Sequence, residues 1–312
     1  MNQNSQPQLR HRPVMVKELL ELMALKPGLV VVDGTVGSGG HAEAILKYIL
    51  PGGRLIGIDH DHAALKRTKE NLSGFNDSIV LVNENFSALN KVLKTLGIPK
   101  VDRILLDLGT SREQLESNTR GFSFMRNAAL DMRMNPEEPY NAGNLVNKLT
   151  EQKLEQLFKE YGEEPFAKRI AKAIVLARRK TPIKTTTELA QIICRVIPKK
   201  ISSKRRIHPA TRVFQALRIA INKELENLST GLEDAYSALS SGGRLCVLSY
   251  HSLEDRIVKE FFKKKLTSLT KKPIKPTREE VLANPSARSA KLRGALKGCT
   301  VENHTPLEKG GS

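Results

Sequence analysis

The run LVVVDGTVGSGGH, residues 29–41, decides the fold class of this chain. Its first four residues are apolar, three of them β-branched, and Asp33 follows, as in a short buried strand. Glycines follow, and apolar residues at helical spacing begin directly after them, from Ala42 to Ile49. A glycine turn between a strand and a helix lets a ligand approach the backbone closely and directs the first N–H groups of the helix at it. The run therefore predicts a ligand-binding turn in an α/β fold.

The segments around this run repeat its alternation of strand and helix. Short apolar strands are predicted at residues 54–59, 79–82 and 103–108. Helices are predicted at residues 41–50, 61–72 and 86–96. Continuous apolar strands joined by helices form a parallel sheet covered on both faces. A fifth strand of this kind, residues 243–250 (GRLCVLSY), comes only after a long interval.

The interval between the fourth and fifth strands is helical. Residues 109–147 are rich in polar residues, Gly and Pro, without a clear period. Amphipathic helices are predicted at residues 150–161, 165–179 and 186–196, and a long helical stretch at 211–239. We expect an α/β domain formed by residues 1–112 and 211–312, and a helical domain, residues 113–210, inserted into it. The tail after Glu260 is predicted to be part loop and part late strands.

Length and composition limit the class of protein. The chain has 312 residues, 39% of them hydrophobic, which is enough for a sizeable core and excludes a wholly disordered chain. Three sparse cysteines without zinc-site spacing argue against a disulfide framework. The polar N-terminus has no signal-peptide pattern, and no apolar run is long enough to span a membrane. We expect a cytoplasmic protein with no membrane partner.

Positive charge is concentrated in the second half of the chain. The formal net charge is +18, yet residues 1–165 hold 20 basic and 21 acidic residues, whereas residues 166–312 hold 31 basic and 12 acidic. Residues 166–184 and 195–212 each contain seven basic residues and no acid, and residues 256–297 contain 13 basic and 3 acidic. One such run is ordinarily a solvated face, but three in one half favour a polyanionic partner: nucleic acid first and an anionic membrane surface second.

The glycine turn suits a nucleoside-containing ligand. Residues 37–42 match the pattern G-x-G-x-x-A, and Asp59, 20 residues beyond Gly39, ends the next strand, where a carboxylate accepts ribose hydroxyls. A P-loop is excluded because Gly39 is followed by Gly and His rather than Lys and Ser or Thr. NAD and S-adenosylmethionine both fit this loop. Acids at the ends of the first and fourth strands, Asp33 and Asp107, favour S-adenosylmethionine. A tight turn without a ligand is the plainer alternative.

Eight stretches of the sequence carry a resemblance to a known family. They are HRPVMVKELLELM, DGTVGSGGHAEAIL, GIDHD, DLGTS with QL and RGFSF, LDMRM, HPATRVFQALRIAINKELENL, GGRLCVLSYHSLEDRIVK and ARSAKLR, in this order from about residue 11 to residue 293. Together they closely resemble the ribosomal RNA small-subunit methyltransferase H family, of MraW type.

The resemblance implies a fold and a reaction. The fold is a Rossmann-like class I methyltransferase sheet with an inserted all-helical domain. The reaction is methyl transfer from S-adenosylmethionine to the exocyclic N4 of one cytidine in the decoding region of small-subunit (16S) ribosomal RNA. The partner is that RNA or the 30S ribosomal subunit, and the oligomeric state, monomer or homodimer, stays open.

The resemblance also assigns residues to the cofactor site. The matching positions are Gly39, Gly40, His41, Asp59, Phe86, Asp107 and Gln114. The three loop residues are expected to contact the methyl donor, Asp59 the ribose and Phe86 the adenine. Asp107 and Gln114 are expected to close the site.

Two departures from the usual family pattern concern this site. After the fourth strand the family reads D-L-G-V-S-S-P-Q-L, whereas residues 107–115 read DLGTSREQL. Loss of the proline removes a restraint on φ and predicts a more mobile loop around Gln114. Tyr250 stands where the family usually has Phe, which keeps the ring and adds a hydroxyl.

Asp107 is the leading candidate for a catalytic residue. The N4 atom of cytosine is a poor nucleophile because its lone pair is delocalised into the ring. A carboxylate that accepts an N4–H helps this nitrogen to attack and then to lose a proton. The carboxyl end of the fourth strand faces the ligand in this architecture. The alternative is that Asp107 only positions the cofactor.

Three residues are candidates for contact with the RNA substrate: His208, Arg212 and His251. Arg212 can reach a phosphate, and His251 follows the fifth strand at the ligand face. An ordinary loop role is the alternative for His251.

Other polar and aromatic residues are expected to be structural. Ser252 and Asp255 have the spacing of a capping box ahead of a helix, and Thr211 is a candidate cap of the long helix. Phe122 and Phe124 are expected in the core. We expect no metal site, because the histidines lack partners at ligand spacing.

Two other function classes share part of this pattern. An NAD-dependent oxidoreductase shares the loop and Asp59 but explains neither the positive half nor Asp107. A non-catalytic RNA-binding or assembly factor keeps the fold, but the intact acids and glycines of the loop argue against it. Comparing thermal stabilisation by S-adenosylmethionine with that by NAD distinguishes a methyltransferase from an oxidoreductase. Methyl transfer to small ribosomal subunits that lack the modification distinguishes an enzyme from a non-catalytic factor.

Overall fold

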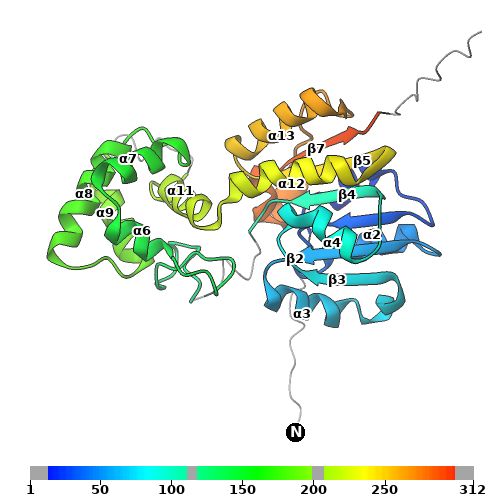
Figure 1. The fold of residues 1–312 in the computed structure, drawn as a ribbon. Helices are drawn as coiled ribbons and strands as arrows, with labels where there is room; N and C mark the ends of the chain where they lie inside the picture. The colour runs from blue at the N-terminus through cyan, green and yellow to red at the C-terminus, as the bar shows by residue number, and fades with distance from the viewer. Residues whose placement is uncertain (1–12, 111–116, 118, 199–206, 299–312) are drawn as a thin grey trace, which may run out of the picture.

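The computed structural model describes residues 13–110, 117, 119–198 and 207–298. They form an α/β part around one sheet and a helical part beside it (Figure 1). The chain returns from the helical part to the sheet through α11 (Thr211–Asn222) and α12 (Glu224–Ala238). The insertion of a helical unit into an α/β fold, expected from the sequence, is therefore confirmed.

The sheet has the strand order β3-β2-β1-β4-β5-β7-β6. The strands are β1 (Val30–Asp33), β2 (Arg54–Asp59), β3 (Ile79–Asn83), β4 (Val101–Asp107), β5 (Leu239–Ser249), β6 (Thr267–Ser268) and β7 (Lys291–Leu296). Strands β1 to β5 pair in parallel, and β7 is antiparallel to β5. This arrangement confirms the class I methyltransferase sheet.

Parallel pairing brings the carboxyl ends of the central strands to one edge. Asp33 ends β1, Asp59 ends β2 and Asp107 ends β4. In the register of the sheet, Asp33 lies beside Gly57 of β2 and Leu105 of β4. Three carboxylates far apart in the sequence therefore share the edge at which α/β sheets bind their ligands.

Helices cover both faces of the sheet. One face packs against α1 (Val16–Met23), α2 (Gly40–Ile49) and α3 (His62–Asn71), and the other against α4 (Leu89–Thr95), α12 and α13 (Ser252–Lys265). Successive residues of β1 alternate between these cores, Val31 in the first and Val32 in the second. Shorter elements complete this part: η1 (Ser73–Ser78), η2 (Phe86–Ala88), α14 (Arg278–Ala283) and η3 (Pro285–Ser289). In the described part of the chain, no helix is both long and apolar enough to cross a membrane.

The helical part has its own apolar core. Its helices are α6 (Ala142–Lys148), α7 (Glu151–Glu160), α8 (Ala167–Lys180), α9 (Thr186–Val196) and α11. Phe158, Ile170 and Leu217 are among the fully buried side chains of this core. Since Leu217 belongs to α11, which the sequence assigned to the α/β domain, we propose that the helical unit extends from the insertion point to Lys223.

Residues 211–239, predicted as one long helical stretch, form two helices, α11 and α12. Lys223 has a φ of 50° and ends α11 by donating its N–H to the Ile219 carbonyl, and α12 begins at the next residue. A lysine is an uncommon residue in the left-handed region, so propensity did not show this break. The helix expected at residues 86–96 is likewise the short η2 followed by α4, and the sequence pattern did not predict α1 or α6.

Candidate cofactor and catalytic site

The glycine loop after β1 has the backbone geometry that its sequence predicted. Gly37 and Gly39 have φ of 54° and 87°, and Gly39 caps the N-terminus of α2. A Cβ on Gly39 would lie 3.1 Å from Thr68 and 3.2 Å from Leu72, so glycine also permits close packing of α3. The Thr68 hydroxyl donates to the Gly37 carbonyl and so ties the loop to α3. A Cβ on Gly40 would meet Pro13 at 3.2 Å, so this glycine serves packing as well.

Asp59 holds the same loop from the end of β2. Its Oδ2 accepts the N–H of Gly37 at 2.9 Å, and its Oδ1 accepts the N–H of Asp61 at 2.9 Å. Burial raises the pKa of this carboxyl above its ordinary range. Each carboxylate oxygen can accept a second hydrogen bond, so Asp59 retains the capacity to bind the two hydroxyls of a ribose.

Asp33, at the end of β1, is a buried acid with an unsatisfied atom. It is 1% exposed, and its Oδ1 accepts the N–H of Thr35 at 3.2 Å. Its Oδ2 has no hydrogen-bond partner among the described residues. Burial raises its pKa to about 7, and His41 and the Thr35 bond oppose this shift. A buried carboxylate oxygen without a partner is satisfied by a cationic donor, and S-adenosylmethionine carries an ammonium group. The residues therefore fit this cofactor.

Asp107 lies at the centre of a polar cluster drawn from four segments. Its Oδ1 accepts the Tyr250 hydroxyl at 2.8 Å and the N–H of Gly109 at 3.3 Å. Its Oδ2 lies 3.6 Å from Nδ1 of His41 on α2. Its own N–H donates to the Thr35 hydroxyl at 2.6 Å. The structure thus brings Asp107 and His41, both predicted site residues, into contact at the cofactor loop.

The expected cofactor contacts of two other residues, Phe86 and Gln114, stay predictions. The ring of Phe86 packs on α12, where a Cβ on Gly231 would lie 2.4 Å from it, so its expected contact with adenine stays a prediction. Gln114 and its loop neighbours Arg112 and Glu113 lie outside the described residues.

His251 is the N-terminal cap of α13. Its Nδ1 accepts the N–H of Glu254 at 3.3 Å, while the Glu254 carboxylate accepts the N–H groups of Tyr250 at 2.8 Å and His251 at 3.2 Å. The capping box predicted for Ser252 and Asp255 is therefore wrong by one residue. Sequence spacing could not distinguish the two, because both pairs are three residues apart and histidine is an unusual cap.

The two residues of the mispredicted box have other partners. Ser252 donates to the Glu163 carboxylate at 2.6 Å, and Asp255 accepts from Arg293 at 2.7 Å and from Lys291 at 3.2 Å. Both contacts fasten α13, the first to the turn between α7 and α8 and the second to β7. They are structural, as expected, although not as a cap.

The candidate RNA residues near α11 are engaged within the protein. Arg212 donates to the Glu163 carbonyl at 2.7 Å. His208 stacks on Phe124 with ring centroids 4.5 Å apart, and its Nδ1 accepts the N–H of Ala210 at 3.2 Å. Thr211 does not cap the helix, because Ala210 occupies that position without a side-chain bond. Contacts of His208 and Arg212 with RNA stay predictions.

The aromatic residues of RGFSF are packed as expected. Phe122 is 7% exposed, and Phe124 packs against the helical core and lies edge-on to Phe214. The same segment contributes a contact that the sequence pattern did not reveal.

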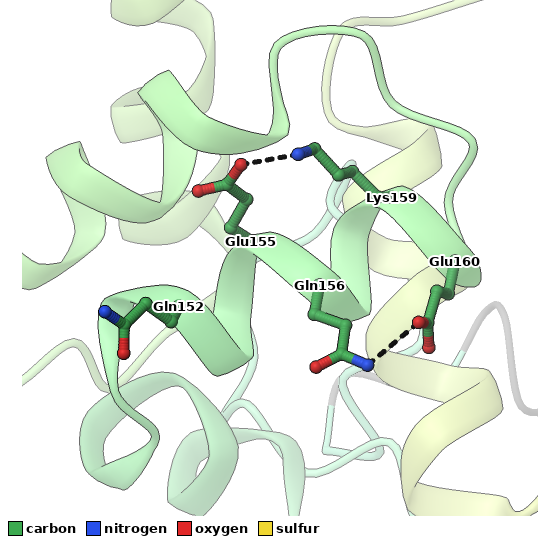
Figure 2. Close-up of a pocket in the computed structure, with 5 residues that line it drawn as sticks. All are labelled: Gln152, Glu155, Gln156, Lys159 and Glu160. Carbon is green, nitrogen blue, oxygen red and sulfur yellow. Dashed lines mark hydrogen bonds and ion pairs between the residues drawn. The ribbon is translucent and has the colours of Figure 1, made fainter.

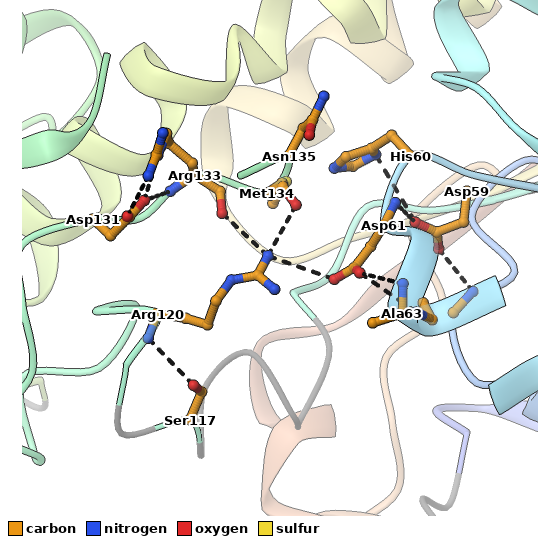
Figure 3. A network of polar contacts seen from close by, with 12 residues as sticks. Asp59, His60, Asp61, Ala63, Ser117, Arg120, Asp131, Arg133, Met134 and Asn135 are labelled. Carbon is orange, nitrogen blue, oxygen red and sulfur yellow. Dashed lines mark hydrogen bonds and ion pairs between the residues drawn. The ribbon is translucent and has the colours of Figure 1, made fainter. Parts of the chain in front are cut away.

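Arg120 links this segment to Asp61, just beyond the end of β2 (Figure 3). Its guanidinium donates to the carbonyls of Arg133 at 3.2 Å and Met134 at 2.9 Å, and it lies 3.5 Å from the Asp61 carboxylate. Asp61 caps α3 and follows Asp59 by two residues. The motifs RGFSF and LDMRM therefore meet the end of β2, a proximity that only the folded chain shows.

Glu224, His251 and Glu254 bring possible metal-ligand atoms within 4.8 Å of one another, a grouping that the sequence did not predict. Glu224 is bound through both oxygens by Arg218, at 2.8 and 2.9 Å. Nδ1 of His251 already accepts the helix-cap N–H, so in the neutral ring the proton sits on Nε2, the other nitrogen. Nε2 is buried without a hydrogen-bond partner among the described residues and lies 3.1 Å from Oε1 of Glu254, so each of the three side chains has a contact within the protein.

A surface hollow lies along α7, in the helical part of the chain (Figure 2). It is lined by Gln152, Glu155, Gln156, Lys159 and Glu160. Lys159 pairs with Glu155 at 2.6 Å, and Gln156 donates to Glu160 at 2.9 Å. Polar groups of one exposed helix that satisfy one another in this way form an ordinary solvated face.

Comparison with known proteins identifies the family of the chain. Residues 8–297 match the MraW methylase family. Proteins named ribosomal RNA small subunit methyltransferase H are 48% identical in Geobacter sulfurreducens, 45% in Desulfosudis oleivorans and 44% in Clostridium botulinum. The matches cover 92%, 92% and 93% of this chain and 98%, 99% and 99% of the relatives. The match over residues 8–297 and the similarity to these relatives show that the chain belongs to the MraW methylase family.

Proposed function

We propose that this chain transfers a methyl group from S-adenosylmethionine to the exocyclic N4 of a cytidine in the decoding region of small-subunit (16S) ribosomal RNA. The observation that carries the proposal is the edge formed by Asp33, Asp59 and Asp107. It combines an acceptor for an ammonium group, an acceptor for a ribose and a carboxylate with spare capacity next to them. The choice of small-subunit ribosomal RNA as the substrate rests on the names of the relatives.

Each part of the cofactor has a matching group at this edge. Asp33 would hold the ammonium group, the loop from Gly37 to Gly39 would lie under the cofactor, and Asp59 would accept the ribose hydroxyls. When bound, S-adenosylmethionine supplies a methyl group that its sulfonium charge has already activated. The protein's task is to align the acceptor nitrogen and to exclude water.

We assign to Asp107 the role of accepting the hydrogen bond, and then the proton, of the N4 atom that is methylated. An oxygen that accepts an N4–H favours the attacking geometry and takes up the proton that N4 must lose. The side chain of Asp107 is 20% exposed, which leaves it within reach of a substrate at the mouth of the site. The competing role, in which Asp107 only positions the cofactor, predicts equal losses of binding and of turnover when it is replaced.

Exposed basic residues supply a surface for RNA phosphates. On and just beyond α8 they are Lys168, Arg169, Lys172, Arg179, Lys180 and Lys184. Arg178 is different, since it donates to the carbonyls of Val146 and Leu149 and so serves the fold. Lys263, Lys264 and Lys265 at the end of α13 add to the charge. Such contacts provide affinity, while the flipped base in the pocket provides specificity. We place the enzyme in the cytoplasm, where ribosomal subunits are found.

The experiment that tests this function uses small ribosomal subunits from a strain that lacks the chain. The purified protein is incubated with these subunits, or with naked 16S RNA, and labelled S-adenosylmethionine. We expect label in N4-methylcytidine at a single position after digestion to nucleosides. Label in another nucleoside would refute the assignment to N4, and no label in either RNA would refute the function.

A further inference from the structure

Tyr250 makes a direct contact with the proposed catalytic carboxylate. It follows β5 and lies 143 residues from Asp107 in the sequence, yet its hydroxyl donates to Oδ1 of Asp107 at 2.8 Å. Its ring lies against Gly109, where a Cβ would be 2.8 Å from the ring edge. One side chain therefore contacts both the carboxylate and the backbone two residues beyond it.

The Tyr250 hydroxyl stays protonated and donates its hydrogen bond to Asp107 at any working pH. Burial, then the charge of Asp107 and the hydrogen bond to it, holds the pKa of Tyr250 well above its usual range, with Glu254 and Glu280 adding to the effect. The phenol is therefore protonated at any working pH. Because Asp107 cannot donate when ionised, the direction of this hydrogen bond is set.

The two oxygens of Asp107 are left with different capacities. Oδ1 accepts from Tyr250 and from the N–H of Gly109, which fills its two acceptor directions. Oδ2 faces Nδ1 of His41 at 3.6 Å, beyond an ordinary hydrogen bond. The Nε2 atom of His41 lies 2.9 Å from the Val14 carbonyl, which fixes the ring as a donor on that side. Oδ2 is thus the oxygen with room for a substrate proton.

We propose that Tyr250 is a positioning residue for methyl transfer, which acts by holding Oδ1 so that Oδ2 of Asp107 receives the proton of the acceptor amine. This inference rests on the proposed function. In the step, the bond from N4 to the methyl carbon forms as the bond from sulfur to that carbon breaks. The electron pair of that bond stays on sulfur, which becomes a neutral thioether, and N4 gives one proton to Oδ2. The proton then leaves to solvent, so charge and atoms balance.

Tyr250→Phe tests this inference, because it removes the hydroxyl and keeps the ring against Gly109. The variant also restores the residue that the family usually has here, so it measures what the added hydroxyl does in this chain. We expect kcat to fall about 10-fold, which corresponds to about 1.4 kcal/mol. The dissociation constant for S-adenosylmethionine, measured by calorimetry, and the KM for RNA are expected to stay within about twofold, and the melting temperature within about two degrees. Tyr236→Phe is the matched control, since Tyr236 lies in the last turn of α12, near Lys265 and Lys297 and ahead of the start of β5, at the edge of the sheet opposite to Asp107.

A double-mutant cycle shows whether Tyr250 acts through Asp107. We expect Tyr250→Phe to cost nothing further in an Asp107→Asn background, both in residual turnover and in cofactor affinity. Additive losses, or a loss of cofactor affinity equal to the loss of kcat, would overturn the positioning role. These outcomes are distinct from failure of the proposed function, in which the unmodified enzyme itself would form no N4-methylcytidine.

Discussion

The backbone N–H of Gly37 donates a 2.9 Å hydrogen bond to Oδ2 of Asp59. This bond ties the glycine loop after the first strand to the end of the second strand. One carboxylate thus shapes the loop, and we propose that it also accepts the ribose hydroxyls. Loop geometry and cofactor affinity are therefore expected to depend on the same side chain.

Replacing Asp59 is expected to weaken cofactor binding. Asp59→Ala removes the anchor of Gly37 and a charged acceptor, and hydrogen bonds to charged groups contribute roughly 1.5–3 kcal/mol. We expect the dissociation constant for S-adenosylmethionine to rise by at least about 10-fold in calorimetry. Asp77→Ala, an exposed position in η1, is the control. An unchanged dissociation constant in Asp59→Ala would remove Asp59 from the site.

Cofactor affinity is expected to rise with pH through the titration of Asp33. Its pKa of about 7 in the free protein means that it is largely protonated at pH 6, whereas an ammonium ligand requires the charged form. We expect affinity to rise by up to about 10-fold per pH unit below pH 7 and to level off above it. In Asp33→Asn this pH dependence disappears. A wild-type affinity that is flat between pH 6 and 8 would contradict the contact.

The same burial makes the cofactor-free protein less stable as pH rises. Because the folded pKa of Asp33 is raised from 3.8 to about 7, its contribution is fully present below pH 3.8 and is lost as pH rises toward 7. Asp33→Asn has no charge to bury, so its melting temperature relative to the wild type should increase across this window. Thermal unfolding at pH 5 and pH 8 without cofactor measures the difference. A constant offset between the two proteins would argue against the raised pKa.

Replacing Asp107 is expected to separate turnover from binding. Asp107→Ala removes the proposed proton acceptor, and general-base groups contribute roughly 10²–10⁴-fold to rate. We expect methyl transfer to fall by such a factor while the dissociation constant for S-adenosylmethionine changes only a few-fold. Calorimetry beside a methylation assay measures both quantities. Equal losses in both would leave Asp107 as a cofactor-positioning residue.

The basic face of α8 is expected to determine the salt dependence of RNA binding. Lys168→Ala with Lys172→Ala removes two exposed cations. The slope of log affinity against log salt should then fall by about 1.5. Lys26→Ala with Lys94→Ala removes two exposed cations at the opposite edge of the sheet and serves as the control. Equal effects of the two pairs would indicate general charge attraction and no docking face on α8.

Relief of backbone strain at Lys223 is expected to stabilise the chain. Lys223→Gly accepts the φ of 50° without a Cβ clash, which should raise the free energy of unfolding by about 0.5–1 kcal/mol in urea denaturation. Lys223→Ala keeps the clash and should show no gain. If both variants are equally stable, the joint between α11 and α12 holds no strain.

Most of the sheet was predictable because its signals are local. A buried parallel strand is a continuous apolar run, and β2 over residues 54–59 has the predicted bounds. The glycine loop, Asp33, Asp59 and Asp107 were found by the same local signals, since each stands at the end of such a run. The break at Lys223 and the cap at His251 were missed because lysine is uncommon at a positive φ and histidine is an unusual helix cap, so neither residue type indicated them.

By itself, the sequence determined the α/β class, the interruption by helices, the loop and the family, since each depends on residues near one another in the chain. Only the tertiary structure decided which side chains meet. Tyr250 reaches Asp107 because β4 and β5 are neighbours, and Arg120 reaches Asp61 because the inserted segment returns to the end of β2. The physical reason is that hydrogen bonds and ion pairs need atoms within about 3–4 Å, and only the folded chain brings these distant residues so close.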